Sequence, residues 1–273
     1  MFTIFSIPKS FKEDTKIIQE NAIASWKKIH PEIEIVLFGD EDGIETIADE
    51  YGCIHWKNIE KNEYGTPLLN SVFMNIRNIS HHKIICYVNC DIILLKDIIP
   101  VIQTVENLQE FLLIGRRTNI TLNGKIDIND PTWEERIRDI VTRNGQIGRP
   151  DAIDCFIFPK NLFINMPPFT VGRGGWDNWL IAHMRKRKIP VIDGSGLISI
   201  VHQNHGYHHV PFQRGSNWEG PETDKNRELM GGIANLYTID DADWILTKEG
   251  IKKKGISLSG LYRDTWRRLK TRK

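Results

Sequence analysis

Long apolar runs and paired cysteines are both missing from this sequence of 273 residues. It contains no run of about 18 apolar residues, the length that a membrane-spanning helix needs. The opening segment, MFTIFSIPKS, lacks the basic start and the apolar stretch of a signal peptide. We therefore expect a cytoplasmic protein. No C-x-x-C pair occurs, which favours buried reduced thiols over metal ligands for the four cysteines, Cys53, Cys86, Cys90 and Cys155.

Internal repeats, low-complexity segments and a G-x-G-x-x-G fingerprint after the first strand are also absent. The hydrophobic share is 40% and the charged share 26%, which excludes a disordered or fibrous chain. The length allows one large domain or two small ones. Because no linker-like change in composition occurs before about Pro211, we expect one catalytic domain over residues 1–210 and a C-terminal extension over 211–273.

Positive charge is concentrated at the C-terminal end of the sequence. Residues 251–273 hold nine Lys or Arg and one Asp, so this segment has a balance of +8. Since the whole chain has a net charge of +1, the remainder is close to −7. Helical spacing gives the segment an apolar face of Leu258, Leu261, Tyr262, Trp266 and Leu269. We expect a helix that either lies peripherally on an anionic membrane surface or packs on the acidic catalytic domain. No nucleic-acid partner is expected.

Apolar periodicity predicts strands that alternate with helices along most of the chain. Such alternation favours an α/β fold with a mostly parallel sheet and helices on both faces. The predicted strands cover residues 2–8, 33–40, 83–89, 110–117 and 152–160. The predicted helices cover residues 13–29, 41–52, 67–80, 98–108, 132–145 and 176–187.

Two acidic residues follow apolar strands directly, and both call for an explanation. Asp40 ends the strand IEIVLFGD, and Asp91 lies within the apolar run KIICYVNCDIILL. Ligands of parallel sheets bind outside the carboxyl ends of the strands, where both carboxylates are expected. Asp40 also suits a turn or a helix N-cap. The same role for Asp91 fits less well, because Ile92, Ile93 and Leu94 separate it from the next predicted helix.

The segment YVNCDIIL resembles the D-x-D-type motif of GT-A fold glycosyltransferases. In that class the motif holds a divalent metal against the diphosphate of a nucleotide sugar. Asn89 stands where the first acid usually does, so Asp91 is the anionic ligand of this pair. The resemblance implies a Rossmann-related GT-A-like sheet, a nucleotide diphosphate sugar as donor, and Mn²⁺ or Mg²⁺ as cofactor. Such ions bind through one or two carboxylates together with substrate phosphates and waters.

A second segment, FTVGRGGWDNWLIAHM, places three glycines before Trp176 and Asp177. It resembles the GT-A segment in which a glycine-rich loop and an aromatic residue precede an acid at the start of a helix. In inverting members of that class the acid takes the proton from the acceptor hydroxyl, which implies that Asp177 is the catalytic base. A helix-capping role for Asp177 remains the alternative from the residues alone.

Histidines cluster in the segment VHQNHGYHH, which follows a predicted strand. By chain order His202 or His205 matches the late histidine that completes the metal site in GT-A enzymes. The alternatives are surface or donor-contacting histidines, and a zinc site, which usually needs further nitrogen or sulfur ligands.

Several further positions are expected to bind the donor or the acceptor. By the same resemblance, the end of the first strand contacts the nucleoside, and the start of the helix near residue 67 offers free N–H groups to the nucleotide. The predicted donor-contacting residues are Ser6, Pro8, Asp40, Thr66, Pro67, Asn70, Asn89 and Asp91. Arg116 and Arg117 are candidates for phosphate or acceptor contacts, and Asp154 is expected on the acceptor side if its strand runs like its neighbours.

The sequence therefore predicts a metal-dependent glycosyltransferase, hexosyl- or related, acting in glycan or polysaccharide biosynthesis. Its acceptor is expected to be a glycan or a lipid-linked glycan. A sugar nucleotidyltransferase is one alternative, although SIPKSFKE lacks the glycine-rich loop typical of that chemistry. A catalytically silent carbohydrate-binding protein is the other, since the eight tryptophans suit sugar stacking in either case.

Overall fold

The computed structural model describes residues 1–162, 164–205 and 219–255, together with residues 263, 265 and 267. The helices are α1 (Glu13–Ile29), α2 (Ile44–Tyr51), α3 (Leu69–Ile79), α4 (Ile98–Val105), α5 (Trp133–Asn144), α6 (Trp176–Lys186) and α7 (Pro221–Met230). The strands are β1 (Phe2–Ser6), β2 (Glu34–Phe38), β3 (Ile54–Trp56), β4 (Ile84–Val88), β5 (Ile92–Leu94), β6 (Leu112–Ile114), β7 (Thr118–Ile120), β8 (Gln146–Ile147), β9 (Cys155–Pro159), β10 (Val191–Asp193), β11 (Ile200–Gln203), β12 (Trp244–Thr247) and β13 (Gly250–Lys253).

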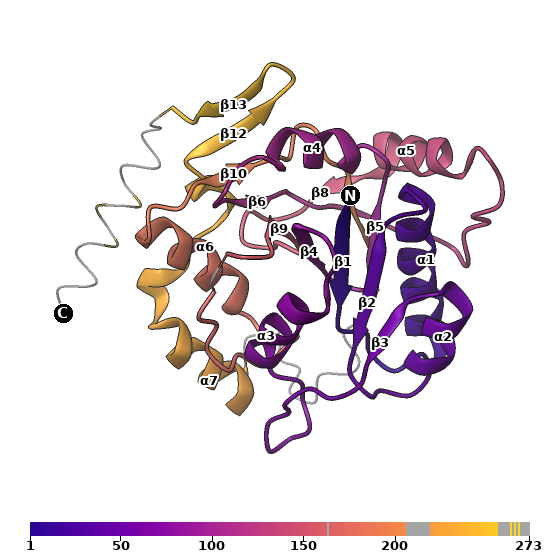
Figure 1. The fold of residues 1–273 in the computed structure, drawn as a ribbon, viewed down its shortest axis with the longest axis horizontal. Helices are drawn as coiled ribbons and strands as arrows, with labels where there is room; N and C mark the ends of the chain where they lie inside the picture. The colour runs from indigo at the N-terminus through magenta and orange to yellow at the C-terminus, as the bar shows by residue number, and fades with distance from the viewer. Residues whose placement is uncertain (163, 206–218, 256–262, 264, 266, 268–273) are drawn as a thin grey trace.

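A nine-stranded mixed sheet forms the centre of the molecule (Figure 1). Its strand order is β13-β12-β10-β6-β9-β4-β1-β2-β3. Strands β9 and β13 pair antiparallel with their neighbours, and the other seven run in one direction. The predicted α/β class with a mostly parallel sheet and flanking helices is confirmed.

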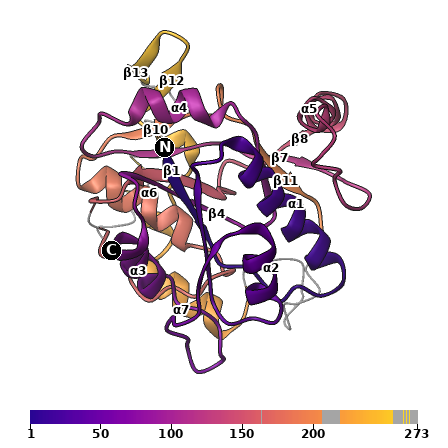
Figure 2. The same ribbon diagram turned by 45° about the vertical axis from the view of Figure 1, so that its right-hand side comes forward.

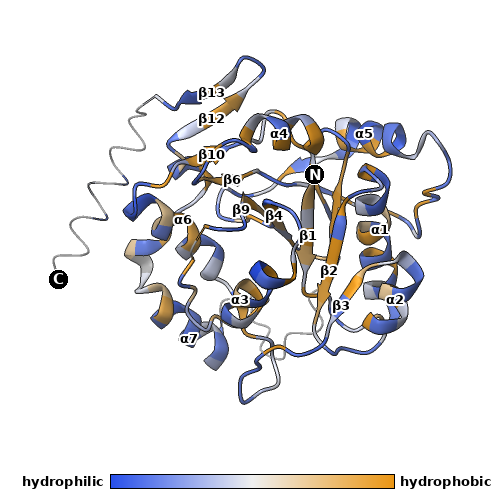
Figure 3. Ribbon diagram, viewed as in Figure 1, coloured by the Kyte–Doolittle hydropathy of each residue, from blue (hydrophilic) through white to orange (hydrophobic). Residues whose placement is uncertain are grey.

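Both faces of this sheet are buried, as near-continuous apolar strands require. Successive residues of β4 alternate between two cores: Cys86 packs with α1, α2 and α4, while Ile85 and Tyr87 pack with α3 and α6. Figure 3 shows hydrophobic residues on the central strands and on α4, and a mostly hydrophilic α5. The sheet thus provides a rigid edge on which polar side chains can be placed.

A second, smaller sheet lies beside the first and has the order β5-β11-β7-β8. Figure 2 shows α5 next to β7, β8 and β11, and α5 packs there through Trp133 and Ile137. The apolar residues after Asp91, which the sequence analysis leaves without an element, form β5. Because β5 pairs antiparallel with β11, it brings the segment before β5 next to the end of β11.

Strand β9 runs opposite to its neighbours β4 and β6, which corrects one expectation. Asp154 was expected on the acceptor side only if its strand ran like the adjacent strands. A parallel strand would have placed Asp154, which precedes β9, at the far edge of the sheet. Because β9 is antiparallel, Asp154 lies at the edge where β4 ends, and Asn89 N–H donates to its backbone carbonyl at 3.0 Å.

The described residues from 219 onward belong to the same domain as the central sheet. Helix α7 lies next to α6 in Figure 1, and β12 pairs with β10, so the C-terminal region extends the central sheet as well as adding helix. The predicted boundary at 210/211 falls outside the described residues, as does the expected apolar face of the tail. Among the described helices, none combines the length and apolarity needed to cross a bilayer.

Two basic residues of the tail contact the domain. Arg267 is buried and donates to both carboxylate oxygens of Asp241 at 2.8 Å. Arg263 Nε lies 3.2 Å from Asp241 Oδ1. Of the two expectations for the tail, these contacts favour packing on the domain for the residues that the structure describes.

Candidate active site

A cavity of about 400 Å³ opens at the edge of the sheet where β1 and β4 end. Its wall is formed by the loop after β1, the segment after β4, the residues before β9, the glycine-rich loop before α6, and the end of β11. Among the described residues, seven of the predicted site residues meet there, namely Asn89, Asp91, Arg117, Asp154, Asp177, His202 and His205. The cavity is therefore the place where the predicted chemistry would occur.

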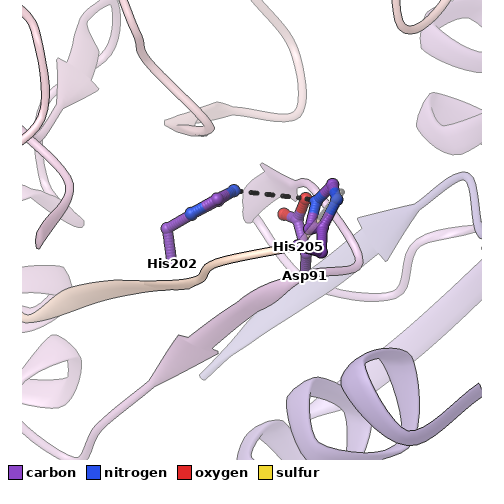
Figure 4. A group of neighbouring side chains, drawn as sticks. All are labelled: Asp91, His202 and His205. Carbon is purple, nitrogen blue, oxygen red and sulfur yellow. Dashed lines mark hydrogen bonds and ion pairs between the residues drawn. The ribbon is translucent and has the colours of Figure 1, made fainter. Parts of the chain in front are cut away.

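Asp91 and two histidines form a compact group of potential metal ligands (Figure 4). His205 Nε2 lies 3.0 Å from Asp91 Oδ2, and His202 Nε2 lies 3.6 Å from the same oxygen. One donor atom from each residue lies within 4.8 Å of the others. The pairing of β5 with β11 explains this approach, because it places the residues before β5 beside those that end β11.

The environment of Asp91 keeps it ionised. Burial alone would raise the pKa of the Asp91 carboxyl, but the hydrogen bonds and charges of His202 and His205 outweigh burial and hold this pKa well below its ordinary value. Asp91 Oδ1 is buried and has no hydrogen-bond partner among the described residues. A buried, unpaired carboxylate oxygen costs free energy unless another group compensates it.

A divalent cation fits this group of side chains. One carboxylate oxygen of Asp91 and the two imidazoles supply three donors, which leaves positions for substrate oxygens or water. Two nitrogen donors suit a first-row ion such as Mn²⁺ better than Mg²⁺, which prefers oxygen ligands. Three protein ligands with an open position also meet the requirement of a catalytic zinc site.

Asn89 takes part in a different interaction from Asp91. Its Oδ1 accepts a hydrogen bond from Tyr87 Oη at 3.0 Å, and its Nδ2 donates to Asp154 Oδ1 at 2.7 Å. Asp154 Oδ2 in turn accepts from Arg117 Nη1 at 2.6 Å. In this structure Asn89 therefore orders the wall of the cavity, and its expected contact with the donor stays a prediction.

Asp177 is held in the cavity wall by the start of α6. The preceding residue, Trp176, packs against the rings of Tyr87 and Phe156 with centroid distances of 5.1 Å, which fixes the first turn on the sheet. The N-cap position is Gly175, in a left-handed conformation with φ 107°, and this residue has no side chain with which to cap the helix. Asp177 lies in the first turn, so it is not the N-cap residue.

The pKa of Asp177 is raised to about 7. Burial is the largest cause, and the charge of Asp154 adds to it, while hydrogen bonds from nearby backbone N–H groups act in the opposite direction. A general base works best with a pKa near the working pH, because it is then both available and basic enough. Asp177 therefore has the placement and the basicity expected of a proton acceptor near neutral pH.

Other predicted donor-binding residues do not line the cavity among the residues that the structure describes. Asp40 is exposed and forms an ion pair with Lys61. Asn70 Nδ2 donates to Glu60 Oε2 at 3.0 Å. Ser6 and Pro8 are buried at the end of β1, whereas their neighbours reach the cavity wall. The nucleotide contacts of these residues stay predictions.

Thr66 and Pro67 contact other loops. Thr66 N–H donates to Asn62 Oδ1 at 2.9 Å, and the carbonyl of Pro67 accepts from Val171 N–H at 3.1 Å. Their expected contacts with the nucleotide also stay predictions.

Four basic residues line the cavity, and the sequence analysis singled out only one of them. They are Lys9, Arg117, Arg149 and Arg173. Lys9 lies in the loop after β1, where ligands of such sheets are expected to bind. This location in the sequence could have identified Lys9 as a candidate site residue. Burial lowers the pKa of Lys9, and the charge of Asp91 partly offsets this effect. Together these cations make part of the wall attractive to phosphate groups.

Comparisons with known proteins give matches in structure alone. No protein-family model and no curated protein sequence matches the chain. Staphylococcus aureus TarS 1–349 matches with 15% identity and a TM-score of 0.33 over 45% of this chain, which spans only 37% of TarS 1–349. TarS 1–349 has also been solved with UDP-GlcNAc.

Glucosyl-3-phosphoglycerate synthase from Mycobacterium tuberculosis matches with 12% identity and a TM-score of 0.44, over 94% of this chain and 88% of that protein. A structure of the same enzyme with Mg²⁺ and UDP matches with 11% identity and a TM-score of 0.42, over 77% of this chain and 73% of that protein. Because these identities are below 25% and the TM-scores below 0.5, the function has to be inferred from the site of this chain itself.

Proposed function

We propose that this chain is a metal-dependent glycosyltransferase that moves a sugar from a nucleotide diphosphate sugar to an acceptor hydroxyl. The observation that carries the proposal is the cavity itself, which is lined both by the group Asp91, His202 and His205 and by Asp177. Cation ligands and a basic carboxylate in one cavity meet the two needs of this reaction, namely binding a diphosphate and accepting a proton.

The three potential metal ligands would help to bind the donor substrate. Asp91, His202 and His205 would bind Mn²⁺ or Mg²⁺, and the ion would supply positive charge against the leaving diphosphate. Lys9 and Arg173 line the same cavity and add fixed positive charge for the phosphates.

Asp177 would act on the acceptor. An alcohol is a weak nucleophile, and a positioned carboxylate that removes its proton contributes about 10²–10⁴-fold to the rate. With a pKa of about 7, this carboxylate becomes ionised as the pH rises through neutrality. We therefore propose that Asp177 is the catalytic base and that the reaction inverts the anomeric configuration.

The acceptor and the cellular setting are further parts of the proposal. The eight tryptophans of the sequence suit stacking on sugar rings. We propose a glycan or a lipid-linked glycan as acceptor, a hexosyl or related group as the transferred sugar, and a role in glycan or polysaccharide biosynthesis. We also propose that the protein works in the cytoplasm and that residues 251–273 bind peripherally to an anionic membrane.

A donor screen tests the proposed function. The purified chain is incubated with a panel of sugar nucleotides and with Mn²⁺, Mg²⁺ or Zn²⁺, and release of free nucleoside diphosphate is measured. We expect turnover of one donor class with Mn²⁺, and loss of both turnover and metal-dependent donor binding in Asp91→Ala. The matched control is Asp139→Ala, which removes an exposed carboxylate of α5. Mn²⁺-dependent nucleotide binding that persists in Asp91→Ala would contradict the metal assignment.

The same screen separates the alternatives. A sugar nucleotidyltransferase would release pyrophosphate from a nucleoside triphosphate and a sugar phosphate, and would leave sugar nucleotides intact in the absence of pyrophosphate. A silent carbohydrate-binding protein would bind sugars without turnover in either assay.

A further inference from the structure

The glycine-rich loop that leads to Asp177 is held from two sides. On one side Leu69 N–H donates to the carbonyl of Phe169 at 2.9 Å, and Val171 N–H donates to the carbonyl of Pro67 at 3.1 Å. These bonds tie the start of the loop to the segment that precedes α3. The other side of the loop faces α7, a helix from the region that sequence analysis assigns to an extension.

Asn226 of α7 binds the loop backbone. Its side chain is fully buried; Oδ1 accepts from Thr170 N–H at 2.9 Å, and Nδ2 donates to the carbonyl of Thr170 at 3.0 Å. Nδ2 also lies 3.4 Å from the carbonyl of Arg173. A buried amide with both of its ends bonded to backbone fixes the path of the loop, since breaking either bond leaves a buried polar group unpaired.

Glu222, one turn earlier on α7, binds the side chain of Arg173. Glu222 Oε2 accepts from Arg173 Nε at 3.0 Å and also from Nη2 of the same guanidinium. Asn62 Nδ2 donates to Glu222 Oε1 at 2.7 Å. Burial would raise the pKa of Glu222, but hydrogen bonds from Asn62, Thr66 and Arg173 outweigh it and keep this pKa below its ordinary value. Glu222 and Arg173 therefore form an ion pair with two hydrogen bonds, which links α7 to a cation of the cavity wall.

The end of α7 also packs against the start of α6. A Cβ atom at Gly175 would lie 3.4 Å from Met230 Sδ, at the short limit of van der Waals contact. With φ 107°, Gly175 also has a backbone conformation that side chains rarely adopt. Asp177 follows two residues later, so a displacement of α7 would be passed to the turn that carries it.

From these contacts we infer that Glu222 and Asn226 are positioning residues, which set the direction of the Asp177 carboxylate and of the Arg173 guanidinium toward the cavity. The inference rests on the proposed transferase function and extends it to a helix that does not line the cavity among the residues described. Misplacement of a reacting group by about 1 Å can cost about 10²-fold in rate, so such support would be needed for catalysis.

The test variant is Glu222→Gln, which preserves the shape of the side chain and removes the charge that holds Arg173. We expect kcat for sugar transfer to fall about 10-fold or more, while the Kd for Mn²⁺ changes less than 2-fold, because Asp91, His202 and His205 are untouched. Glu222→Asp, which retains the charge, should recover part of kcat. The matched control on the same helix is Asp224→Ala, an exposed carboxylate that pairs with Arg227 and should retain wild-type kcat.

A second measurement does not depend on turnover. The carboxyl carbon of Asp177 is titrated by NMR and assigned with Asp177→Asn. We expect its titration midpoint to shift in Glu222→Gln and to stay in place in Asp224→Ala. If the wild-type chain turns over no sugar nucleotide, the proposed function fails, but the titration still decides whether α7 positions Asp177.

Two results would overturn the inference. One is an unchanged kcat together with an unchanged Asp177 titration in Glu222→Gln. The other is loss of transfer accompanied by equal losses of metal binding and of thermal stability, which would assign α7 to general stability. Asn226→Ser, a smaller change at the second contact, should follow the pattern of Glu222→Gln if the inference holds.

Discussion

Asp177, the proposed catalytic base, illustrates how the environment of one side chain can weaken the fold. Its pKa is raised from 3.8 to about 7, chiefly by burial, so the folded protein holds a proton that the unfolded chain has already lost at pH 5 or 6. The contribution of this group to stability is therefore full below about pH 4, falls as the pH rises from about 4 to 7, and is lost above pH 7. At alkaline pH the fold therefore contains a buried carboxylate for which hydrogen bonds compensate only in part.

The variant Asp177→Asn should reveal this effect as a stability difference that depends on pH. Relative to the wild type, we expect the variant to gain stability between pH 4 and pH 8, by up to about 4 kcal/mol, since each pKa unit is worth about 1.4 kcal/mol. Urea unfolding of both proteins across this range measures the difference. A difference that stays constant with pH would show that Asp177 titrates normally.

The candidate residues Asp91 and Asp177 could be selected from the sequence, whereas the partners of other cavity residues could not. Asp91 and Asp177 can be selected from local patterns, because one lies within an apolar run and the other follows a glycine-rich turn at the start of a helix. The partner of Arg173 is Glu222, 49 positions away, and the partner of Asn89 is Asp154, 65 positions away. No local pattern marks such pairs, because the pairing of β4 with β9 brings one of them together and the packing of α7 against the glycine-rich loop brings the other.

At the scale of elements, long periodic segments were predictable and short ones were not. The predicted helix over residues 13–29 has the bounds of α1, and Gly52 ends α2 in a left-handed conformation as its position predicts. Strands of three residues such as β5 are too short to show alternation. The direction of β9 was also hidden, because a strand buried on both faces has the same apolar pattern whether it runs parallel or antiparallel.

The C-terminal segment offers a test at this scale through Arg267. Its guanidinium pairs with Asp241, donates to the carbonyl of Leu236 at 2.8 Å and lies 3.9 Å from the ring centroid of Tyr237. Removing one partner of a buried ion pair typically costs about 3–5 kcal/mol. We expect Arg267→Ala to lose about 3 kcal/mol in the free energy of unfolding, with Arg263 retaining part of the compensation of Asp241.

Chemical denaturation near pH 7 measures this loss. Arg143→Ala is the comparison, because Arg143 is exposed and pairs with Asp139 at 3.6 Å. Its substitution should change stability by less than about 0.5 kcal/mol. Equal effects of the two substitutions would show that the tail does not stabilise the domain.

At the scale of the whole molecule, charge is divided between an acidic body and a basic end. Residues 1–250 have a net charge of about −7, whereas residues 251–273 have a net charge of +8. Two of the tail cations, Arg263 and Arg267, neutralise Asp241 within the domain. The charge available to a partner is therefore smaller than the sequence count indicates.

Membrane association is tested with the cations that follow Arg267. A variant with Arg268, Lys270, Arg272 and Lys273 replaced by Gln leaves Arg263 and Arg267 in place, so the domain contact is preserved. We expect the wild-type chain to sediment with anionic vesicles at low salt, since each cation near the surface contributes about 1 kcal/mol. The variant should stay in the supernatant, as should the wild type once salt screens the attraction. Equal sedimentation of both proteins would rule out an electrostatic role for the tail.

The antiparallel strand β9 also has a consequence for synthesis of the protein on the ribosome. It lies between β4 and β6, so a nascent chain that ends before residue 155 presents open edges on both strands. Open edges template association between chains, and at about 5–20 residues per second the exposure after β4 lasts several seconds. Arrival of β9 closes both edges and brings Asp154 to Asn89 in the same event. Pairing of these edges and the contact of Asp154 with Asn89 are thus acquired together, before the glycine-rich loop, His202 and His205 that complete the cavity wall are made. A chaperone would be useful in the interval before this pairing.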